Sequence, residues 1–336
     1  MGERPTAPNG IILFNYPVSP FGRRVSWYLA LRGIGYALCE QPFIMPRPDL
    51  EKLGLKYRRI PILTIGRDVY LDTRLIIRKL EEKFPDGKLG SEKPEEVFVE
   101  KLLEKYMVEG PVFSMATGLV PAQMMNDAKV MEDRKGFCGR DWTRESLEQG
   151  RPECLVYVRN LFDFLETTIL ADGRKWILNS AKPSLADIEA IWPMDWLVGM
   201  EGAVPSHVVS EKHFPKVYAW IHRFRAALDE AQSAAPGTAV LDGDEAVNVI
   251  LQSSFSEGTG TVDQNDGSGL KAGTEVELYP ADWGSEHRDV GQLVALGPDE
   301  VTVEAKGTGG AGAGAAGLRI HGPRTGFRVT EMGGST

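Results

Sequence analysis

The chain has 336 residues, of which 42% are hydrophobic and 25% charged, the composition of an ordinary globular protein with room for two or three domains. No apolar run is long enough for a membrane-spanning helix and the first residues lack the apolar stretch of a secretory signal, so we expect no membrane contact and a cytoplasmic location. Residues 241–336 hold 15 acidic and 6 basic residues, which accounts for the whole net charge of −9 and argues against nucleic acid as a partner.

Residues 11–85 alternate strand and helix signals. The apolar run IILF at 11–14 predicts a strand, and apolar residues at helical spacing after it predict a helix that ends at Gly33, a residue type common at helix C-termini. Asp72 or Thr73 can cap a later helix over LIIRKLEEKF. Between the two helices lie three further strand signals, at YALCEQ, IPILTIG and DVYL. We therefore expect a β-α-β unit followed by a β-β-α unit.

Residues 94–232 show only helical patterns, after a polar linker at 88–94. Four segments have apolar residues at helical spacing: EEVFVEKLLEKYMVEG, PECLVYVRNLFDFLETTIL with Pro152 near its start, PSLADIEAIWPMDWLVGM, and VYAWIHRFRAAL. In the third segment Ser184 and Asp187 have the spacing of a capping box, which we interpret as structural. Residues 126–136 are charged and only weakly patterned.

Residues 242–336 differ from the rest, and a linker is expected before them at 232–243. A short helix is predicted at DEAVNVILQSSF, and strand signals follow at TEVELYP, VGQLVALG, EVTVEAK, LRIHGP and GFRVTEM. This spacing predicts a small all-β barrel or sandwich with a flexible glycine-rich loop at 307–317. The stretches PADWGSEHRD and IHGPRTGFR mix charged and aromatic residues, which indicates either a binding face or turns with salt bridges between strands.

The segment YPVSPFGRR, between the first strand and the first helix, raises a chemical question. Backbone N–H groups at a helix start are unpaired and lie at the positive end of the helix dipole, so an anion or a thiolate is stabilised there. Ser19 lies at this point and Pro20 takes the first helical position. Ser19 therefore either caps the helix alone or also holds a negatively charged sulfur.

Four features in this order and spacing resemble the glutathione S-transferases: Ser19-Pro20, a helix ending in Gly-Ile, Ile60-Pro61, and Asp72-Thr73. The resemblance covers residues 11 to about 230. It implies a thioredoxin-like α/β domain at 1–87 and an all-helical domain at 94–232, with the small all-β module at 242–336 added behind them. More narrowly, SPFGRRVSWYLALRG, YRRIPIL and YLDTRLII resemble a fungal group of glutathione-transferase-like proteins with an added C-terminal β domain.

The resemblance implies how the sulfur and the peptide backbone of glutathione would be held. Ser19 would donate a hydrogen bond to the sulfur and favour its thiolate, with Tyr16 as a rival hydroxyl. The bond before Pro61 would be cis, so that the backbone of Ile60 pairs with the cysteinyl part of glutathione.

The resemblance also implies how the charged ends of glutathione would be held. Asp72 would bind the γ-glutamyl ammonium and Thr73 the neighbouring α-carboxylate, at positions where the family usually has Glu or Gln followed by Ser. Arg59 and Arg47 are candidates for the glycine carboxylate, and other basic residues lie near them in the sequence: Arg23, Lys56 and Arg58.

The sequence specifies the binding sites of the second substrate and of other cofactors less clearly. An apolar pocket for a hydrophobic small molecule could be lined by Phe113, Met115, Met124, Met125, Trp142 and Trp196. The five histidines show no ligand spacing, and the three cysteines, Cys39, Cys138 and Cys154, fit neither a metal site nor a disulfide framework. We therefore expect glutathione as co-substrate and no metal.

The sequence leaves three functions to compare. A glutathione-dependent transferase would add the thiolate to a hydrophobic electrophile by conjugation, isomerisation or cyclisation, in detoxification or in fungal secondary metabolism. The alternative is a binding or regulatory protein that kept the fold and lost the chemistry. A glutaredoxin-like reductase is disfavoured because position 19 is not a cysteine. The family also implies a homodimer.

Overall fold

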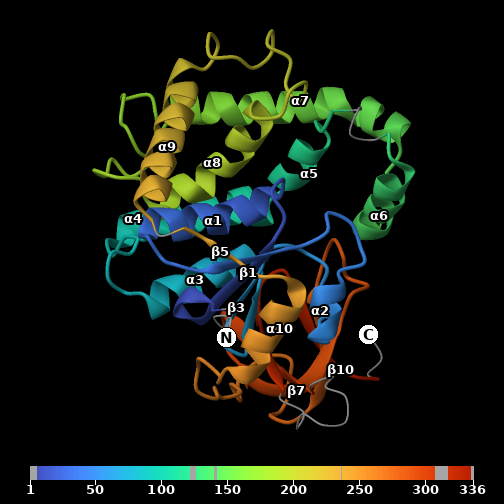
Figure 1. Cartoon of the computed structure of the whole chain (residues 1–336). Coiled ribbons are helices and arrows are strands. Elements are labelled where there is room, and N and C mark those ends of the chain that lie inside the picture. Colours follow the sequence, from blue (N-terminus) through green and yellow to red (C-terminus); the bar gives the residue numbers. More distant parts are fainter. Residues whose placement is uncertain (1–5, 122–125, 140–141, 236, 307–316, 334–336) are drawn as a thin grey trace.

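The computed structural model describes residues 6–121, 126–139, 142–235, 237–306 and 317–333. Met124, Met125 and nearly all of the predicted 307–317 loop lie outside these ranges. The fold is the one expected from the sequence: a thioredoxin-like part, a helical part and a C-terminal β-strand region (Figure 1). No helix within the described ranges is long and apolar enough to cross a membrane.

The strands of the described residues form one sheet in the order β10-β6-β7-β8-β9-β4-β3-β1-β2-β5. The sheet strands are β1 (Ile11–Asn15), β2 (Ala37–Glu40), β3 (Ile62–Ile65), β4 (Asp68–Leu71), β5 (Ala239–Val240), β6 (Glu275–Pro280), β7 (Asp289–Leu296), β8 (Glu300–Ala305), β9 (Leu318–Pro323) and β10 (Phe327–Glu331). β1 pairs with β2 in parallel and with β3 in antiparallel register, and β3 and β4 form a hairpin.

The helices lie mainly above this sheet in Figure 1. They are η1 (Pro8–Gly10), α1 (Pro20–Arg32), α2 (Pro48–Lys52), α3 (Thr73–Lys83), α4 (Pro94–Glu104), the π-helical turn η2 (Lys105–Glu109), α5 (Val112–Thr117), α6 (Ala128–Cys138), α7 (Arg144–Thr167), α8 (Leu185–Val198), α9 (Pro215–Ala234) and α10 (Gly243–Gln252). The capping box predicted at Ser184 is present at the start of α8, where Asp187 accepts from the Ser184 backbone N–H at 2.9 Å.

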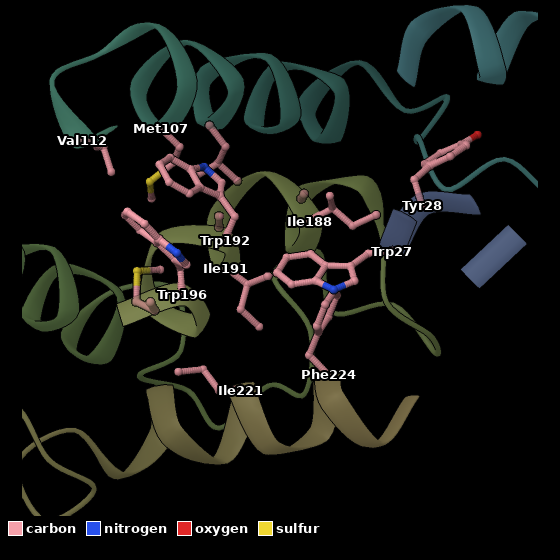
Figure 2. Packing of buried hydrophobic residues seen from close by; sticks show 14 of the residues in the cluster. Trp27, Tyr28, Met107, Val112, Ile188, Ile191, Trp192, Trp196, Ile221 and Phe224 are labelled. Atoms are coloured by element: carbon pink, nitrogen blue, oxygen red, sulfur yellow. The ribbon is translucent and has the colours of Figure 1, made fainter. Parts of the chain in front are cut away.

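Two apolar cores lie on the two faces of the sheet, because side chains alternate along a strand. Ile11 and Leu13 belong to a core shared with α1, α3 and the helical part, whereas Ile12 and Phe14 belong to a core shared with the C-terminal strands. Figure 2 shows the middle of the first core, where α8 is surrounded by side chains of α1, η2, α5 and α9. The labelled residues there include Trp27, Met107, Val112, Trp192, Trp196 and Phe224.

The C-terminal strands continue the thioredoxin-like sheet. β9 pairs in parallel with β4 at one edge of the first part of the sheet, and the earlier strand β5 pairs in parallel with β2 at the other edge. His321 of β9 contacts both neighbouring strands: its Nε2 lies 2.9 Å from Oδ1 of Asp68 on β4, and its Nδ1 lies 2.7 Å from Oε1 of Glu300 on β8. The predicted all-β region is therefore present, but it shares both a sheet and a core with the first domain.

Three local expectations differ from the structure. From Ala128 onward the weakly patterned segment 126–136 lies in helix α6. Helix α7 begins at Arg144, eight residues before Pro152, which lies inside the helix. The expected linker at 232–243 contains the end of α9, the short strand β5 and the start of α10. By contrast, the Ile60–Pro61 bond is cis, as expected, and the Met45–Pro46 bond is also cis.

Candidate functional site

A cavity of about 620 Å³ lies where the thioredoxin-like part, the helical part and the C-terminal region meet. The structure brings every residue named for glutathione to its lining: Tyr16, Ser19, Arg47, Arg59, Ile60, Pro61, Asp72 and Thr73. Phe113, Trp142 and Trp196 of the expected apolar wall also line it. Met115 is packed against the first core and is not among the lining residues, and Met124 and Met125 lie outside the described ranges.

Ser19 is the N-cap of α1 and is almost fully buried at the cavity wall. Its Oγ accepts a hydrogen bond from the backbone N–H of Gly22 at 3.0 Å. The cap uses a lone pair of the hydroxyl oxygen, so the hydroxyl hydrogen is still available for donation. Capping and thiolate binding are therefore compatible at the same side chain. Gly22 is required by packing, because a Cβ there would collide with the side chain of Asn15.

Asp72 is held in place by an arginine two residues later. Its Oδ1 accepts from the backbone N–H of Arg74 at 3.0 Å and from Nε at 2.9 Å, and its Oδ2 accepts from the guanidinium at 3.0 Å. Burial disfavours the charged carboxylate, but Arg74 outweighs this effect and lowers the pKa of Asp72 to about 2. The backbone φ of Asp72 is 68°, a region that non-glycine residues rarely adopt and that is often found at functional sites.

Thr73 begins α3 and is a buried residue of the cavity lining. Its Oγ1 accepts a hydrogen bond from Arg24 of α1, and Arg24 in turn pairs with Glu189 of α8. Burial raises the pKa of Glu189, and Arg24 partly offsets that effect. Because the Thr73 oxygen accepts its hydrogen bond from Arg24, the Thr73 hydroxyl can still donate a hydrogen bond to a bound anion. The helical part thereby positions a side chain of the first domain.

Tyr16 and Arg47 lie together beside Ser19. The Arg47 guanidinium lies 5.8 Å from the centre of the Tyr16 ring, and this ring meets Phe43 edge-on at 5.3 Å. Arg47 also donates to the carbonyls of Arg58 and, at 3.2 Å, of Pro42. Burial lowers the pKa of Arg47 to about 10. Within the described residues no carboxylate lies in salt-bridge distance of Arg47, so its charge can serve a ligand anion.

Arg59 is already engaged by the C-terminal region. Its Nε donates to the carbonyl oxygen of Trp283 at 2.8 Å, and its guanidinium pairs with the carboxylate of Asp282. Asp282 and Trp283 both line the cavity. The sequence contained a signal for this contact in the mixed charged and aromatic stretch PADWGSEHRD, but nothing in that stretch indicated which site it would join.

Among the further lining residues, Arg58 was named from the sequence as a nearby basic residue, whereas Arg134 and Phe137 were not named. Arg58 and Arg134 lie near Phe137 of α6, with the Arg58 guanidinium 4.8 Å from the ring centre, and Arg58 pairs with Asp133 at 2.9 Å. Arginines exceed carboxylates in the lining as a whole, which favours an anionic ligand: Arg23, Arg47, Arg58, Arg59, Arg74 and Arg134 against Asp72, Glu109 and Asp282. Cys138 also lines the cavity, at the C-terminal end of α6, where the helix dipole disfavours a thiolate.

A second cluster of titratable groups lies at the join between β4 and β9. Glu257, Glu300 and His321 come close enough together to share a cation. The ammonium of Lys79 already lies 2.9 Å from a carboxylate oxygen of each glutamate. We interpret this cluster as a charge network that holds the two parts of the sheet together.

The comparisons with known proteins agree with this fold. Residues 13–92 match the family model described as glutathione S-transferase, N-terminal domain, and residues 115–233 match that of a domain of unknown function, DUF7962. Glutathione S-transferase U7 of Arabidopsis thaliana is 23% identical over 66% of this chain and 85% of its own length. Glutathione transferase GST 23 of Zea mays is 22% identical over 68% of this chain and 91% of its own.

A solved GST-like protein from Pseudomonas syringae is similar over 96% of this chain and 99% of its own, with a TM-score of 0.68 and 22% identity. This likeness shows a shared fold, and its coverage includes most of the C-terminal β-strand region. Together the matches support the glutathione S-transferase superfamily.

Proposed function

We propose that this relative of the glutathione S-transferases binds glutathione in the 620 Å³ cavity and adds its thiolate to a hydrophobic electrophile. The observation that supports this most is the convergence of a helix-start serine, an Asp-Thr pair and the Ile60-Pro61 backbone on one arginine-rich cavity. The tripeptide carries two carboxylates and one ammonium, so it matches a lining in which arginines exceed carboxylates but a buried aspartate is also present.

In this proposal Ser19 donates its hydroxyl hydrogen to the glutathione sulfur while its oxygen still caps α1. A donor to the charged form of a group lowers the pKa of that group, so the thiolate is populated nearer neutral pH. Tyr16 also carries a hydroxyl in the lining and takes the role if Ser19 does not.

The charged ends of glutathione are held by the Asp-Thr pair and by an arginine. Asp72 receives the γ-glutamyl ammonium, and Thr73 donates to the adjacent α-carboxylate at the N-terminus of α3. Arg47, with its buried charge, and Arg59, after release from Asp282, are the candidates for the glycine carboxylate.

In the chemical step, bonds form and break only within the two substrates, while Ser19 stabilises the thiolate. The cysteinyl S–H loses its proton to solvent, and a sulfur lone pair forms a bond to the electrophilic carbon. In a substitution the leaving group departs with the bonding pair; in an addition the displaced π pair takes up a proton. Holding both reactants in one cavity can supply about 7–11 kcal/mol of the barrier when they are well oriented. Isomerisation or cyclisation would follow if the thiolate leaves again.

The experiment that tests glutathione binding compares Thr73→Val with Thr73→Ser by calorimetric titration. Valine keeps the shape but removes the hydroxyl, and a hydrogen bond to a charged group contributes about 1.5–3 kcal/mol. We expect Thr73→Val to weaken glutathione binding at least tenfold and Thr73→Ser to bind like the wild type. Equal affinities of all three proteins would show that the Thr73 hydroxyl does not bind glutathione.

A non-catalytic binding protein is the alternative, and one contact favours it. The Asp282 carboxylate already pairs with Arg59, where the glycine carboxylate would otherwise bind. A wild type that binds hydrophobic ligands but not glutathione would support this alternative. Reductase chemistry is disfavoured, since burial raises the pKa of Cys39 to about 12 and keeps it a thiol.

We further propose a homodimer in the cytoplasm. Phe98, Leu102 and Tyr106 follow one another at helical spacing along α4 and η2, all of them exposed, and the Tyr106 ring lies 6.4 Å from exposed Phe164 of α7. An exposed apolar patch of this kind is typical of an interface. The division into units at 1–87, 94–232 and 242–336 also remains a proposal, as do the fungal group and a role in detoxification or secondary metabolism.

A further inference from the structure

Residues 281–284, which follow β6, run from the C-terminal region to the cavity. Two backbone hydrogen bonds hold this segment, from Ala281 N–H to the Gly326 carbonyl at 2.9 Å and from Gly284 N–H to the Phe137 carbonyl at 2.9 Å. The Arg59 side chain adds a third bond, from Nε to the Trp283 carbonyl at 2.8 Å. These anchors belong to the C-terminal region, the helical part and the thioredoxin-like part respectively. The position of Trp283 is therefore fixed by all three parts of the molecule.

The Trp283 side chain joins an aromatic wall. Its ring centre lies 5.1 Å from that of Phe113 on α5, 5.6 Å from Phe137 on α6 and 6.3 Å from Trp142, and it meets the last two edge-on. These distances lie in the range in which aromatic rings attract one another. All four residues line the cavity, and Trp283 is only half-buried. By contrast, Trp192 and Trp220 in the first core are fully buried.

We propose that Trp283 is a specificity-determining residue: it forms the outer wall of the second-substrate subsite and selects planar aromatic electrophiles. This inference rests on the proposed transferase function for its chemistry, although the aromatic subsite itself does not require glutathione. Trp283 lines the same cavity as Ser19, and a flat aromatic ligand can add to the existing ring contacts. The C-terminal region would thus complete the active site.

The fixed backbone explains why tryptophan is suited to this task. The carbonyl of Trp283 is held by Arg59, and Gly284 has a φ of 78°, which lets the chain turn back to Phe137. A Cβ at Gly284 would approach the Arg58 side chain to 3.1 Å, so the turn is closely packed. A large ring on a fixed backbone loses little conformational freedom when a ligand binds, and a preorganised wall discriminates by shape.

The test compares Trp283→Ala and Trp283→Phe with the wild type, using 1-chloro-2,4-dinitrobenzene as a planar aromatic electrophile and iodomethane as a small aliphatic one. We expect Trp283→Ala to raise KM for the aromatic electrophile at least tenfold and to leave turnover of iodomethane and calorimetric glutathione affinity unchanged. Trp283→Phe should restore most of the loss. Val290→Ala, an exposed change on β7 outside the cavity lining, is the matched control for general effects on the C-terminal region.

A second readout separates this inference from the proposed function. The fluorescent aromatic anion 1-anilinonaphthalene-8-sulfonate is titrated into each protein without glutathione. Weaker binding to Trp283→Ala than to the wild type supports the aromatic wall even if no transferase activity is found. Unchanged dye affinity, or an equal loss of rate with both electrophiles, would overturn the role of Trp283, whereas absence of glutathione binding in the wild type would overturn only the transferase proposal.

Discussion

The pair of Asp72 and Arg74 offers the most quantitative prediction. Both side chains are about nine-tenths buried, and the arginine lowers the pKa of Asp72 from 3.8 to about 2. One pKa unit corresponds to about 1.4 kcal/mol, so the ionised carboxylate contributes roughly 2 kcal/mol to folding at neutral pH. Asp72→Asn keeps a good N-cap residue and removes only the charge. We expect its free energy of unfolding in urea at pH 7 to fall by roughly that amount.

The sign of the pH dependence follows from the depressed pKa. The contribution of Asp72 is fully present above pH 3.8 and is lost as the pH falls through about 2, so wild type and Asp72→Asn should converge in stability at low pH. A matched control is available in Asp172, which makes the same contacts to Arg174 two residues later but is more than half exposed. We expect Asp172→Asn to have a much smaller effect, because exposed pairs contribute little. Equal losses in the two variants would refute the argument from burial.

Three further predictions follow from the fold. Burial opposes protonation of His321, but Asp68 and Glu300 outweigh burial and raise the pKa of His321 above 6.5. The contribution of His321 to the free energy of unfolding should therefore be complete below pH 6.5 and decrease as the pH rises through the raised pKa. Urea denaturation of the wild type should show this pH dependence, and His321→Gln should lack it. Gly66→Ala should lower the free energy of unfolding by more than about 2 kcal/mol, because φ is 58° and the new Cβ would collide with the Ser254 carbonyl. Gly33→Ala has a similar φ of 61° but open space around the new Cβ, so it should lower the free energy of unfolding by about 1–2 kcal/mol in the same assay. Phe98→Asp combined with Leu102→Asp should convert a dimer into a monomer in sedimentation experiments, and an unchanged sedimentation coefficient would remove this surface from the interface.

Local patterns in the sequence predicted most of the elements near the site. The strand signals at IILF and IPILTIG, the cap at Asp72 and the C-cap at Gly33 depend on a few neighbouring residues, and each is found in the structure. Helix α6 was not predicted because none of its described residues is buried, so it has no apolar stripe to detect. The first turns of α7 are similarly polar, so the pattern did not predict that this helix begins at Arg144, before Pro152.

The arrangement of the C-terminal strands could not be read from the sequence. Pairing of β9 with β4 joins residues about 250 apart, and a strand pattern does not specify its partner. The same holds for the site: Ser19, Asp72 and Thr73 could be named from motifs, whereas Trp283 reaches the cavity through hydrogen bonds to three distant parts of the chain. Thr73 was named, but its support by Arg24 and Glu189 depends on the packing of α1 against α8.

The central claim is that Ser19 holds a glutathione thiolate. The most direct measurement is calorimetric titration of glutathione into the wild type and Ser19→Ala, with the ultraviolet absorbance of the bound thiolate recorded at the same time. The account predicts binding and thiolate absorbance in the wild type and loss of that absorbance in Ser19→Ala. Equal absorbance in both proteins would assign the sulfur to Tyr16 or a backbone N–H, and absence of binding in both would contradict the glutathione site itself.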